Sequence, residues 1–435
     1  MFSFKRSIGA LIGNAMQFYD FTIYAFLAPY ISREFFNFKN QYISYLVVFS
    51  IFAGGYLSRP LGSLLFGNIG DKKGRSFALS KTILVSTIAT FMMGITPGYT
   101  AIGILAPLAL VILRLIQGIA VSGEEGGAVV LLFEKFAFKN GGVIGSTVLS
   151  SVLIGVIIGS IVCAIISQLI SHLVLNNWAW RIPFLLALPF GVIATILRFY
   201  LNDFKLFELA EKHNLILKRP TKFLFLNYSP MIIYGFCIVS IYSITTSTLI
   251  VHFPYFLTVK SGFSHDSSLK ILTLAISLVA CLTPVFGKVC NKFNPTLIYN
   301  ASLVGLIFFG PILFYLLSLN NVIAIFSAIV IFSTIISLIS STVFSILVGI
   351  FPFSVRYSGV SLSFNLSVTV FSSSTPLLLI IIENNFNNYF APGIYISLLS
   401  TFFIIIIWYL QQKFSIKYFN ETPSEILIYQ STIPS

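Results

Sequence analysis

Charged residues are scarce in this chain of 435 residues, of which only 9% are Asp, Glu, Lys or Arg. Because a soluble globular domain carries about 25% charged residues, this scarcity excludes an ordinary protein that faces water on all sides. Hydrophobic residues make up 57% of the chain and form long continuous runs, whereas a transmembrane barrel would show an alternating pattern. The sequence therefore predicts an all-α membrane protein, in which each helix satisfies its own backbone hydrogen bonds.

Cysteine and histidine are also rare, with four of each. The cysteines lie in or beside apolar runs and the histidines are scattered, so neither set has the spacing of metal ligands. The chain lacks a glycine-rich phosphate loop ending in Gly-Lys-Ser/Thr, which argues against ATP as an energy source. No polar cluster resembles a catalytic set. We therefore expect no metal, no cofactor other than a proton gradient, and no enzyme activity.

Twelve apolar runs are each long enough to cross the roughly 30 Å hydrocarbon core of a membrane. They predict spans at residues 8–32, 43–66, 77–96, 101–126, 142–171, 182–201, 228–254, 266–287, 296–318, 321–347, 354–382 and 391–411. The longest polar stretch, rich in Lys and Glu, separates six spans from six. The predicted division is an N-terminal half at 1–201, a cytoplasmic central loop at 202–227, a C-terminal half at 228–412 and a short cytoplasmic tail at 413–435.

The formal net charge is +13, and most basic residues fall in short loops on one side of the predicted helices. Lys and Arg accumulate in the cytoplasmic loops of membrane proteins, so the charge indicates topology rather than a nucleic-acid partner. No cleavable signal peptide is expected, because polar residues interrupt the first apolar run. We expect a multi-pass monomer in a bacterial cytoplasmic membrane, with both termini in the cytoplasm and the lipid bilayer as its surroundings.

An internal repeat supports the two halves. Phe66-Gly67 ends the second span and leads into a loop of Gly, Asp, Lys and Arg, while Phe286-Gly287 ends the eighth span and leads into Lys and Asn. Such repeats are typical of secondary transporters, in which one half moves against the other. The pattern indicates transport of a small solute.

Ionisable residues inside the predicted spans are costly to bury and therefore informative. The first span carries Asp20, and the fourth carries Arg114, Gln117 and Glu124. A buried carboxylate facing a buried guanidinium is a plausible proton switch, because a solute that draws Arg114 away lets Asp20 bind a proton. We assign proton coupling to Asp20, Arg114 and Glu124. The alternative is a static ion pair that only fixes helix packing.

The loop after the second span combines turn-forming glycines with one acid and three bases. A glutamate at the end of the fourth span is the expected partner of these bases. Together they predict a cytoplasmic gate whose salt bridges break as the halves move. The gate residues are Gly67, Asp71, Gly74, Arg75 and Glu134. The alternative is a merely solvated basic loop.

Candidate solute-binding residues come from the first, fourth and eleventh spans. Asn365 lies deep in the eleventh span, which Pro376 interrupts, so this span is expected to be mobile and to line a cavity. A guanidinium would hold a carboxylate, and an aromatic ring would hold a cationic group. The predicted set is Tyr19, Asp20, Tyr24, Arg114, Gln117, Arg356 and Asn365. Arg59 either joins this set or extends to the membrane surface.

These motifs together resemble the major facilitator superfamily and, within it, the metabolite:proton symporter family that includes proline/betaine transporters. The first span reads Gly13-Asn14-Ala15-Met16-Gln17-Phe18-Tyr19-Asp20-Phe21, similar to the family's Gly-Asn-x-x-Glu-Trp-Tyr-Asp-Phe. Further resembling stretches lie at 59–62, 67–75, 114–118, 123–128, 180–184 and 356–359. The resemblance covers nearly the whole chain. It implies twelve transmembrane helices in two six-helix halves, alternating access and proton-coupled uptake.

Several positions depart from the family pattern. Gln17 and Phe18 stand where the family has Glu and Trp, and Glu125 stands where an aromatic residue is usual. Without a carboxylate at position 17, Asp20 and Glu124 would have to carry proton coupling. The short tail lacks the heptads of osmosensing relatives, so osmotic gating is not expected.

The preferred hypothesis is proton-coupled uptake of a small zwitterion such as proline or betaine. The second hypothesis is a dicarboxylate such as 2-oxoglutarate, with Arg59, Arg114 and Arg356 supplying positive charge. Two convergent arginines would favour the dicarboxylate, whereas one arginine with an aromatic box would favour the zwitterion. A third hypothesis, from a different class, is a sensor that kept the fold and lost transport.

Overall fold

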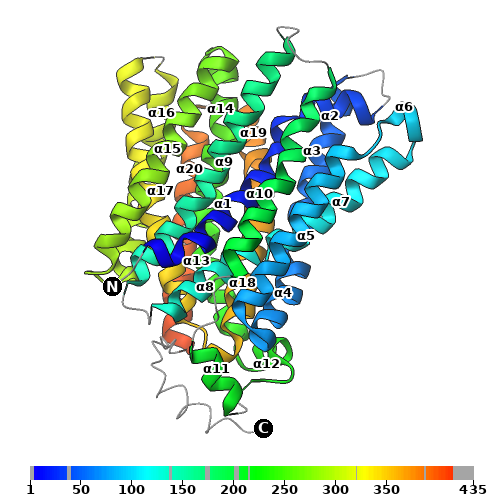
Figure 1. The fold of residues 1–435 in the computed structure, drawn as a ribbon. Coiled ribbons are helices and arrows are strands. Elements are labelled where there is room, and N and C mark those ends of the chain that lie inside the picture. The colour runs from blue at the N-terminus through cyan, green and yellow to red at the C-terminus, as the bar shows by residue number, and fades with distance from the viewer. Residues whose placement is uncertain are drawn as a thin grey trace.

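The structure, a computed structural model, describes residues 4–36, 41–136, 140–171, 177–199, 205–213, 216–319, 321–386 and 388–414. Within these ranges every regular element is a helix. The long helices run side by side as one bundle, and the short helices α11 (Lys205–Lys212) and α12 (Pro220–Asn227) lie at one end of it (Figure 1). We call this the central-loop end. The opposite end is the outer end.

The helices before α11 form the N-terminal group. They are α1 (Phe4–Phe26), α2 (Ala28–Phe35), α3 (Gln41–Leu57), α4 (Arg59–Lys73), α5 (Arg75–Ile95), α6 (Tyr99–Ile102), α7 (Leu105–Val121), α8 (Glu124–Lys135), α9 (Gly141–Ser171), the 3-10 helix η1 (Asn177–Arg181) and α10 (Ile182–Phe199).

The helices after α12 form the C-terminal group, which contains three π-helical segments and one 3-10 helix. They are α13 (Ser229–Ser247), η2 (Thr248–His252), α14 (Phe253–Tyr255), η3 (Phe256–Lys260), α15 (His265–Cys290), α16 (Pro295–Ser318), α17 (Val322–Gly349), η4 (Phe353–Val355), α18 (Arg356–Ser367), η5 (Val368–Ser372), α19 (Ser373–Phe386) and α20 (Ala391–Phe414). The predicted tail lies, beyond Phe414, outside the described residues.

Ten helical stretches of the described chain are long and apolar enough to cross a membrane, and they match the third to twelfth predicted spans. The first two predicted spans are each divided by one residue, Leu27 between α1 and α2 and Ser58 between α3 and α4. A proline follows each break, in the first turn of the next helix. Proline is tolerated there because the first turn has no backbone acceptor for its missing N–H.

The segment predicted as a plain polar loop contains α11 and α12. Its sequence is polar overall, but Phe207 and Ala210 of α11 are buried against Phe353 of η4. This small apolar contact gives α11 one sheltered face. The described part of the predicted central loop therefore contains two short helices, of which α11 packs on η4.

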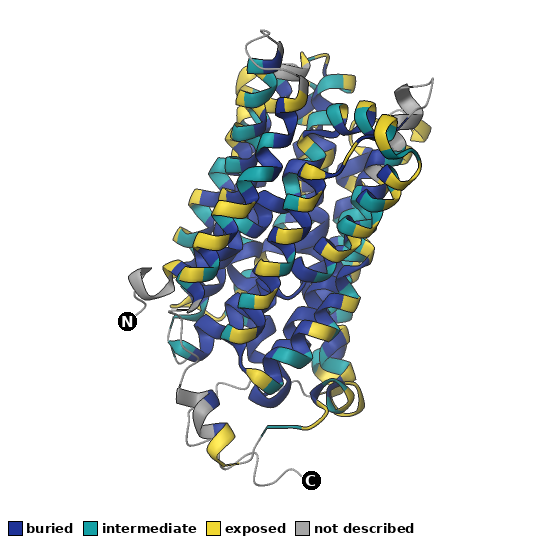
Figure 2. Cartoon of the chain, turned by 45° about the vertical axis from the view of Figure 1, so that its right-hand side comes forward, coloured by how far each residue is buried: buried dark blue, intermediate teal, exposed yellow. Residues whose placement is uncertain are grey.

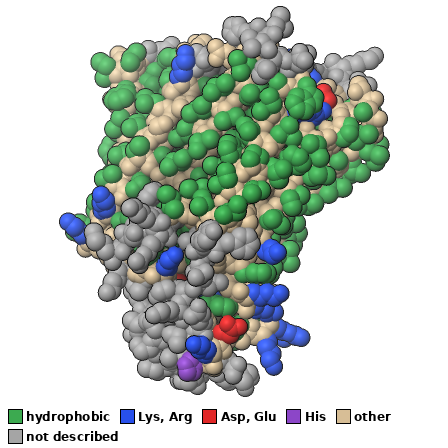
Figure 3. Space-filling model, in the orientation of Figure 1, with side chains coloured by type: hydrophobic (Ala, Val, Ile, Leu, Met, Phe, Trp, Pro, Cys, Tyr) green, Lys and Arg blue, Asp and Glu red, His purple; other side chains and the backbone are tan. Residues whose placement is uncertain are grey.

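Exposed and buried positions alternate along the long helices of the bundle (Figure 2), and many of the exposed positions carry large apolar side chains. Examples that are more than half exposed are Leu57, Phe308, Leu398 and Trp408. One face of the molecule is covered with hydrophobic side chains, and Lys and Arg lie mostly toward the central-loop end (Figure 3). Soluble monomers rarely expose apolar patches of more than a few hundred Å². This exposed apolar surface is therefore the part of the protein that contacts lipid.

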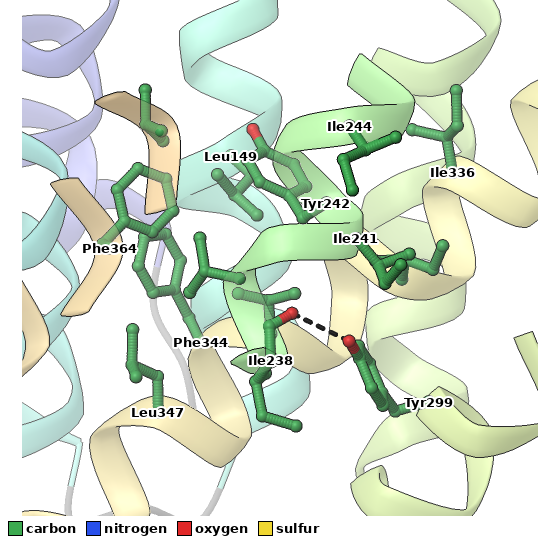
Figure 4. Close-up of a cluster of buried hydrophobic side chains, with 14 of the residues drawn as sticks. Leu149, Ile238, Ile241, Tyr242, Ile244, Tyr299, Ile336, Phe344, Leu347 and Phe364 are labelled. Carbon is green, nitrogen blue, oxygen red and sulfur yellow. Dashed lines mark hydrogen bonds between the residues drawn. The ribbon is translucent and has the colours of Figure 1, made fainter. Parts of the chain in front are cut away.

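The interior contains one large apolar cluster in the C-terminal group. Figure 4 shows its centre, where the Tyr299 hydroxyl donates a hydrogen bond to the Ile238 carbonyl oxygen at 2.8 Å. Leu149, from α9 of the N-terminal group, lies beside Tyr242 of α13 in this cluster. The core thus continues from one group of helices into the other.

The two groups meet between the central-loop end and the middle of the bundle. Helix α18 packs against α4 and α8, and α9 packs against α15 and α17. The backbone N–H of Gly142, in the first turn of α9, donates to Oδ1 of Asn291 at 2.9 Å. Asn291 follows α15, in the second copy of the internal repeat. In the middle of the bundle, Thr369 of η5 donates to the carbonyl oxygen of Tyr56 in α3 at 2.8 Å.

Candidate functional site

The first copy of the internal repeat joins the two groups through Asp71 of α4. Its carboxylate accepts hydrogen bonds from the backbone N–H groups of Tyr357 at 3.1 Å and Ser358 at 3.0 Å. These N–H groups lie in the first turn of α18 and have no acceptor within the helix. A carboxylate is favourable at this position because the helix N-terminus carries partial positive charge. Asp71 therefore holds α18 against α4.

Glycines allow this close packing. A Cβ on Gly67 would lie 2.7 Å from Cα of Ser358, and a Cβ on Gly70 would lie 1.9 Å from Cδ1 of Tyr357. Gly74, between α4 and α5, has φ of 100°, a backbone conformation that favours glycine. The glycines of the predicted gate are thus required by contact and by backbone geometry.

Glu134 of α8 lies between two arginines from opposite groups. Nε of Arg75 is 3.0 Å from Oε2 of Glu134, and Nη1 of Arg356 is 3.4 Å from Oε1. Arg75 also donates to the carbonyl oxygen of Phe353 at 2.8 Å and stacks on its ring. Asp71 lies 3.5 Å from Arg75. We call Asp71, Arg75, Glu134 and Arg356 the end cluster; it brings together the charged residues of the predicted gate.

Two residues predicted to bind solute instead hold the groups together. Arg356 belongs to the end cluster, because its position at the start of α18 places it beside Glu134. Asn365 donates to the carbonyl oxygens of Ser122 and Ser361, each at 2.8 Å. Ser122 lies at the break between α7 and α8, so its carbonyl oxygen is available to accept this hydrogen bond. Both placements depart from the expected solute-binding set.

Glu124 forms an ion pair inside the N-terminal group, with Arg198 of α10. Thr82 also donates to this carboxylate at 3.0 Å, and Arg198 donates to the Leu79 carbonyl oxygen at 2.9 Å. The pair connects four helices and is fully buried. Sequence reasoning missed Arg198 as its partner. A usable signal was Gly13, whose missing side chain leaves room for the guanidinium only 2.5 Å from where a Cβ would lie.

The expected pair between Asp20 and Arg114 is not formed. Arg114 donates to the carbonyl oxygen of Phe21 at 3.0 Å and to the side chain of Gln117. Gln117 in turn donates to the carbonyl oxygen of Asp20 at 3.0 Å. The Asp20 carboxylate itself is buried and has no hydrogen bond or ion pair with any described residue. Arg114 thus reaches the backbone of α1 and not the Asp20 side chain.

Arg59 lies beside Arg114 in the centre of the bundle. It is only 2% exposed, so it does not extend to the membrane surface. The guanidinium carbons of Arg59 and Arg114 lie 4.6 Å and 3.9 Å from the centre of the same ring, Phe21. Nε and Nη2 of both arginines have no hydrogen-bond acceptor. Two guanidinium groups therefore converge with unused donors.

Aromatic rings and one carboxylate complete this group. Tyr56 lies under Arg59 at 4.5 Å, and Phe52 lies under Arg114 at 4.6 Å. Glu125 is buried and interacts with the charge of Arg59 without a contact shorter than 4.0 Å, and its charge also acts on Tyr242. We call Arg59, Arg114, Phe21, Phe52, Tyr56, Glu125 and Tyr242 the two-arginine cluster. The sequence shows Glu125 as a charge inside the fourth span and as a departure from the family pattern, but it was not among the predicted site residues.

The two tyrosines of the first span have different surroundings. Tyr24 lies 5.0 Å from the Arg114 guanidinium and stacks on Phe52, and its hydroxyl has no partner. Tyr19 points away, with its hydroxyl bonded to the Pro183 carbonyl oxygen at 2.8 Å. Tyr24 therefore borders the two-arginine cluster, whereas Tyr19 fixes α1 to α10.

Comparison with known proteins places this geometry in a family. The family model described as Major Facilitator Superfamily matches residues 10–376. The chain belongs to the major facilitator superfamily. It is 29% identical over 412 residues to a protein named putative proline/betaine transporter from Staphylococcus aureus strain MSSA476, covering 93% of this chain and 88% of that one. It is also 29% identical over 405 residues to the proline/betaine transporter of Escherichia coli K12, covering 91% and 81%.

Solved structures of other superfamily members share the fold. The proton:xylose symporter XylE bound to 6-bromo-6-deoxy-D-glucose matches with a TM-score of 0.71, 14% identity and 98% coverage of both chains. The human organic anion transporter MFSD10 matches with a TM-score of 0.65 and 12% identity, covering 94% of this chain and all of that one. The fold is therefore the twelve-helix major facilitator fold, as predicted. The protein is a multi-pass membrane transporter.

Proposed function

We propose that this transporter takes up a small zwitterion of the proline or betaine type by proton-coupled alternating access. The observation that carries the proposal is the two-arginine cluster, in which buried donors lack acceptors beside a buried carboxylate and several rings. A buried polar group without a partner is costly. A bound solute would supply the missing acceptors. The relatives named as proline/betaine transporters agree with this substrate class.

The carboxylate of the solute would bind Arg114. Nε and Nη2 of this residue are unused, and a guanidinium can hold a carboxylate through two parallel hydrogen bonds. Its remaining Nη1 donor is fixed by α1 and Gln117. The fork is therefore already oriented before a solute arrives.

The cationic end of the solute would lie near Glu125 and the aromatic rings. A carboxylate attracts an ammonium group, and the faces of Phe and Tyr rings attract quaternary or secondary amines. Arg59 balances the charge of Glu125 while no solute is bound. Arg59 and Arg114 meet the criterion of two convergent arginines that would favour a dicarboxylate, but Glu125 opposes the charge of Arg59 and leaves Arg114 as the arginine without an opposing acid. This arrangement, together with the aromatic box, is complementary to a zwitterion.

A dicarboxylate is the second candidate, because Arg59 and Arg114 share the Phe21 ring. Glu125 distinguishes the two. It would repel a second carboxylate from the site, whereas it would attract a cationic amine.

The end cluster would form the cytoplasmic gate, drawn here in its closed state. Hydrogen bonds of Asp71 and the ion pairs of Glu134 hold the two groups together at the central-loop end, so we assign solute entry to the outer end. On this proposal the central-loop end faces the bacterial cytoplasm, both termini are cytoplasmic, and the division into halves at 1–201 and 228–412 defines the moving bodies. The protein would act as a monomer, driven by protons without another cofactor.

Proton coupling is assigned to Asp20. Its carboxylate is buried without a cation, so its charge is costly in this conformation and a proton would relieve that cost. Glu124 is less suited, because Arg198 and Thr82 already satisfy it. The proposal thus keeps Asp20 from the predicted coupling set and assigns Glu124 a packing role.

The test is uptake into proteoliposomes of labelled proline, betaine and 2-oxoglutarate under an imposed pH gradient. We expect the wild type to accumulate proline or betaine, and the Glu125→Gln variant to lose most of this uptake. If the wild type accumulated 2-oxoglutarate alone, and Glu125→Gln left or improved that uptake, the dicarboxylate assignment would replace ours. Gradient-driven accumulation that survives in Asp20→Asn would show that Asp20 is not the coupling residue.

A further inference from the structure

Another buried acid, Glu383, lies in the C-terminal group, far along the bundle from the end cluster. Nε2 of His252 is 2.9 Å from Oε1 of Glu383, and the two side chains are 0% and 2% exposed. His252 ends η2 and Glu383 lies in α19, near the outer end of the bundle (Figure 1). An imidazole and a carboxylate inside a membrane span are expensive to bury. Because of this cost, we expect the pair to have a function other than helix packing.

The second polar atom of each side chain in this pair has no hydrogen-bond partner. Nδ1 of His252 and Oε2 of Glu383 are buried and have no hydrogen-bond partner. Glu383 lines a cavity of about 30 Å³ together with Phe256, Lys260, Asn388 and Tyr389. A water molecule needs roughly 10–15 Å³ of such space and two to four polar partners. The cavity offers both, so water can reach the carboxylate.

The surroundings include few other ionisable groups. Lys260 of η3 and Tyr389 face Glu383 across the cavity, and the charge of Glu383 acts on Tyr255 of α14. The other neighbours of the imidazole are aromatic rings, with Phe256 and Phe314 at 6.3 Å and 5.8 Å. Among the residues that line the cavity, Lys260 carries the one positive charge. The imidazole, when protonated, and Lys260 are therefore the two cationic groups that this carboxylate would balance.

We propose that His252 and Glu383 form a second proton-binding site, loaded from the outer end through this cavity. A neutral imidazole hydrogen-bonded to a carboxylate takes one proton from a hydronium ion that enters through the cavity, leaves a water molecule behind, and becomes an imidazolium–carboxylate pair. One N–H bond forms, one O–H bond of a hydronium ion breaks, and no redox change occurs. Histidine suits this task because its ordinary titration range lies between about pH 5 and pH 8.

The site connects to the proposed transport cycle through two helices. His252 continues from α13, which carries Tyr242 of the two-arginine cluster. Glu383 follows η5, whose Thr369 donates to the Tyr56 carbonyl oxygen at 2.8 Å. Both helices contain π-helical turns, which are common at functional sites. Protonation would change the bond between these helices on the side from which a solute enters. This second step rests on the proposed function.

The first experiment needs no solute. Histidine-selective ¹⁵N NMR of the full chain in lipid nanodiscs follows the imidazoles from about pH 5 to about pH 8, with His252→Asn identifying the signal. We expect His252 to titrate, and its titration to shift in Glu383→Gln but not in the control Glu211→Gln, an exposed acid on α11. A His252 signal that stays constant over this range, or that ignores Glu383→Gln, overturns the proton-binding site.

The second experiment compares two transport modes in proteoliposomes. Solute exchange without a gradient is measured beside accumulation under a pH gradient, using proline or betaine. Under the pH gradient, we expect the ratio of accumulation to exchange in Glu383→Gln to be as low as the ratio that the wild type shows when no gradient is imposed. The control variant His213→Asn, at an exposed histidine, should keep the ratio that the wild type shows under the gradient. An unchanged ratio in Glu383→Gln overturns the link to transport. Failure of the wild type to move either solute would refute the proposed substrate class and leave the NMR test decisive.

Discussion

Buried charges in this transporter differ in how completely their hydrogen-bonding atoms are used. Glu124 is satisfied by Arg198 and Thr82, whereas Arg59 and Arg114 keep unused donors. A satisfied pair fixes helices in place, and an unsatisfied one is ready for a ligand. The sequence places Glu124 and Arg114 in one set, but their hydrogen bonding differs: Glu124 fixes helices, and Arg114 has donors left for a ligand.

Breaking the satisfied pair should cost stability. Glu124→Gln leaves the Arg198 guanidinium buried without a countercharge, and we expect a loss of about 3 to 5 kcal/mol. The control is Glu34→Gln, which removes the partner of Arg181 from a pair whose acid is 38% exposed, and which should cost at most about 1 kcal/mol. Unfolding of the purified protein in detergent measures both.

Replacing the pair with apolar residues extends this test. The double variant Glu124→Leu, Arg198→Leu should be more stable than Glu124→Gln, because no unpaired charge remains. Equal losses for Glu124→Gln and Glu34→Gln would contradict a structural role for this ion pair.

The sequence predicts which residues are buried charges better than which of them meet. Asp71, Arg75 and Glu134 were expected together because they lie at adjoining helix ends, where position along the chain nearly determines position in space. Asp20 and Arg114 lie in the middle of long helices, where a small rotation changes which neighbour each side chain faces. Their pairing could not be predicted from one sequence.

At the scale of helices, long apolar runs predict spans well, but a proline alone does not predict a break. Pro189, Pro284, Pro311 and Pro376 lie inside helices that continue through them, so Pro376, contrary to expectation, does not interrupt its helix. Pro29 and Pro60 follow the breaks in the first two spans. No sequence feature predicts the π-helical segments η2, η3 and η5, because any apolar run is compatible with α or π hydrogen bonding. The helices of the central loop were missed because α11 buries only a small apolar contact.

Helix contact at α4 and α18 should depend on the missing side chain of Gly70. In Gly70→Ala the new Cβ would lie 1.9 Å from the Tyr357 ring, so α18 must move away. Gly54→Ala is the matched control, since its nearest neighbouring atom, on Leu115, is 3.9 Å away. We expect faster maleimide labelling of Ser354→Cys in the Gly70→Ala background alone, using a chain without native cysteines. Equal labelling rates in both backgrounds would show that this contact does not close the central-loop end.

For the whole molecule, both copies of the internal repeat join the two groups of helices, but they do so through different side chains. Asp71 binds the first turn of α18, and Asn291 binds the first turn of α9. Both join one group to the other at the central-loop end. Of these two residues only Asp71 is charged, and Arg75 connects it to Glu134. The repeat was visible in the sequence, but its function in joining opposite groups required the structure.

The end cluster should therefore control which conformation the whole transporter adopts. Glu134→Gln leaves Arg75 and Arg356 facing each other without the carboxylate between them, so the closed central-loop end loses attraction and gains repulsion. Spin labels at Lys73 and Lys292, exposed positions of opposite groups, would report longer distances in this variant by double electron–electron resonance. Glu211→Gln removes an acid from the same end outside the cluster and should leave the distances unchanged. If Glu134→Gln gave the wild-type distribution, the hydrogen bonds of Asp71 and the apolar contacts of α9 would be sufficient to hold this end closed, and the charges would not act as a gate.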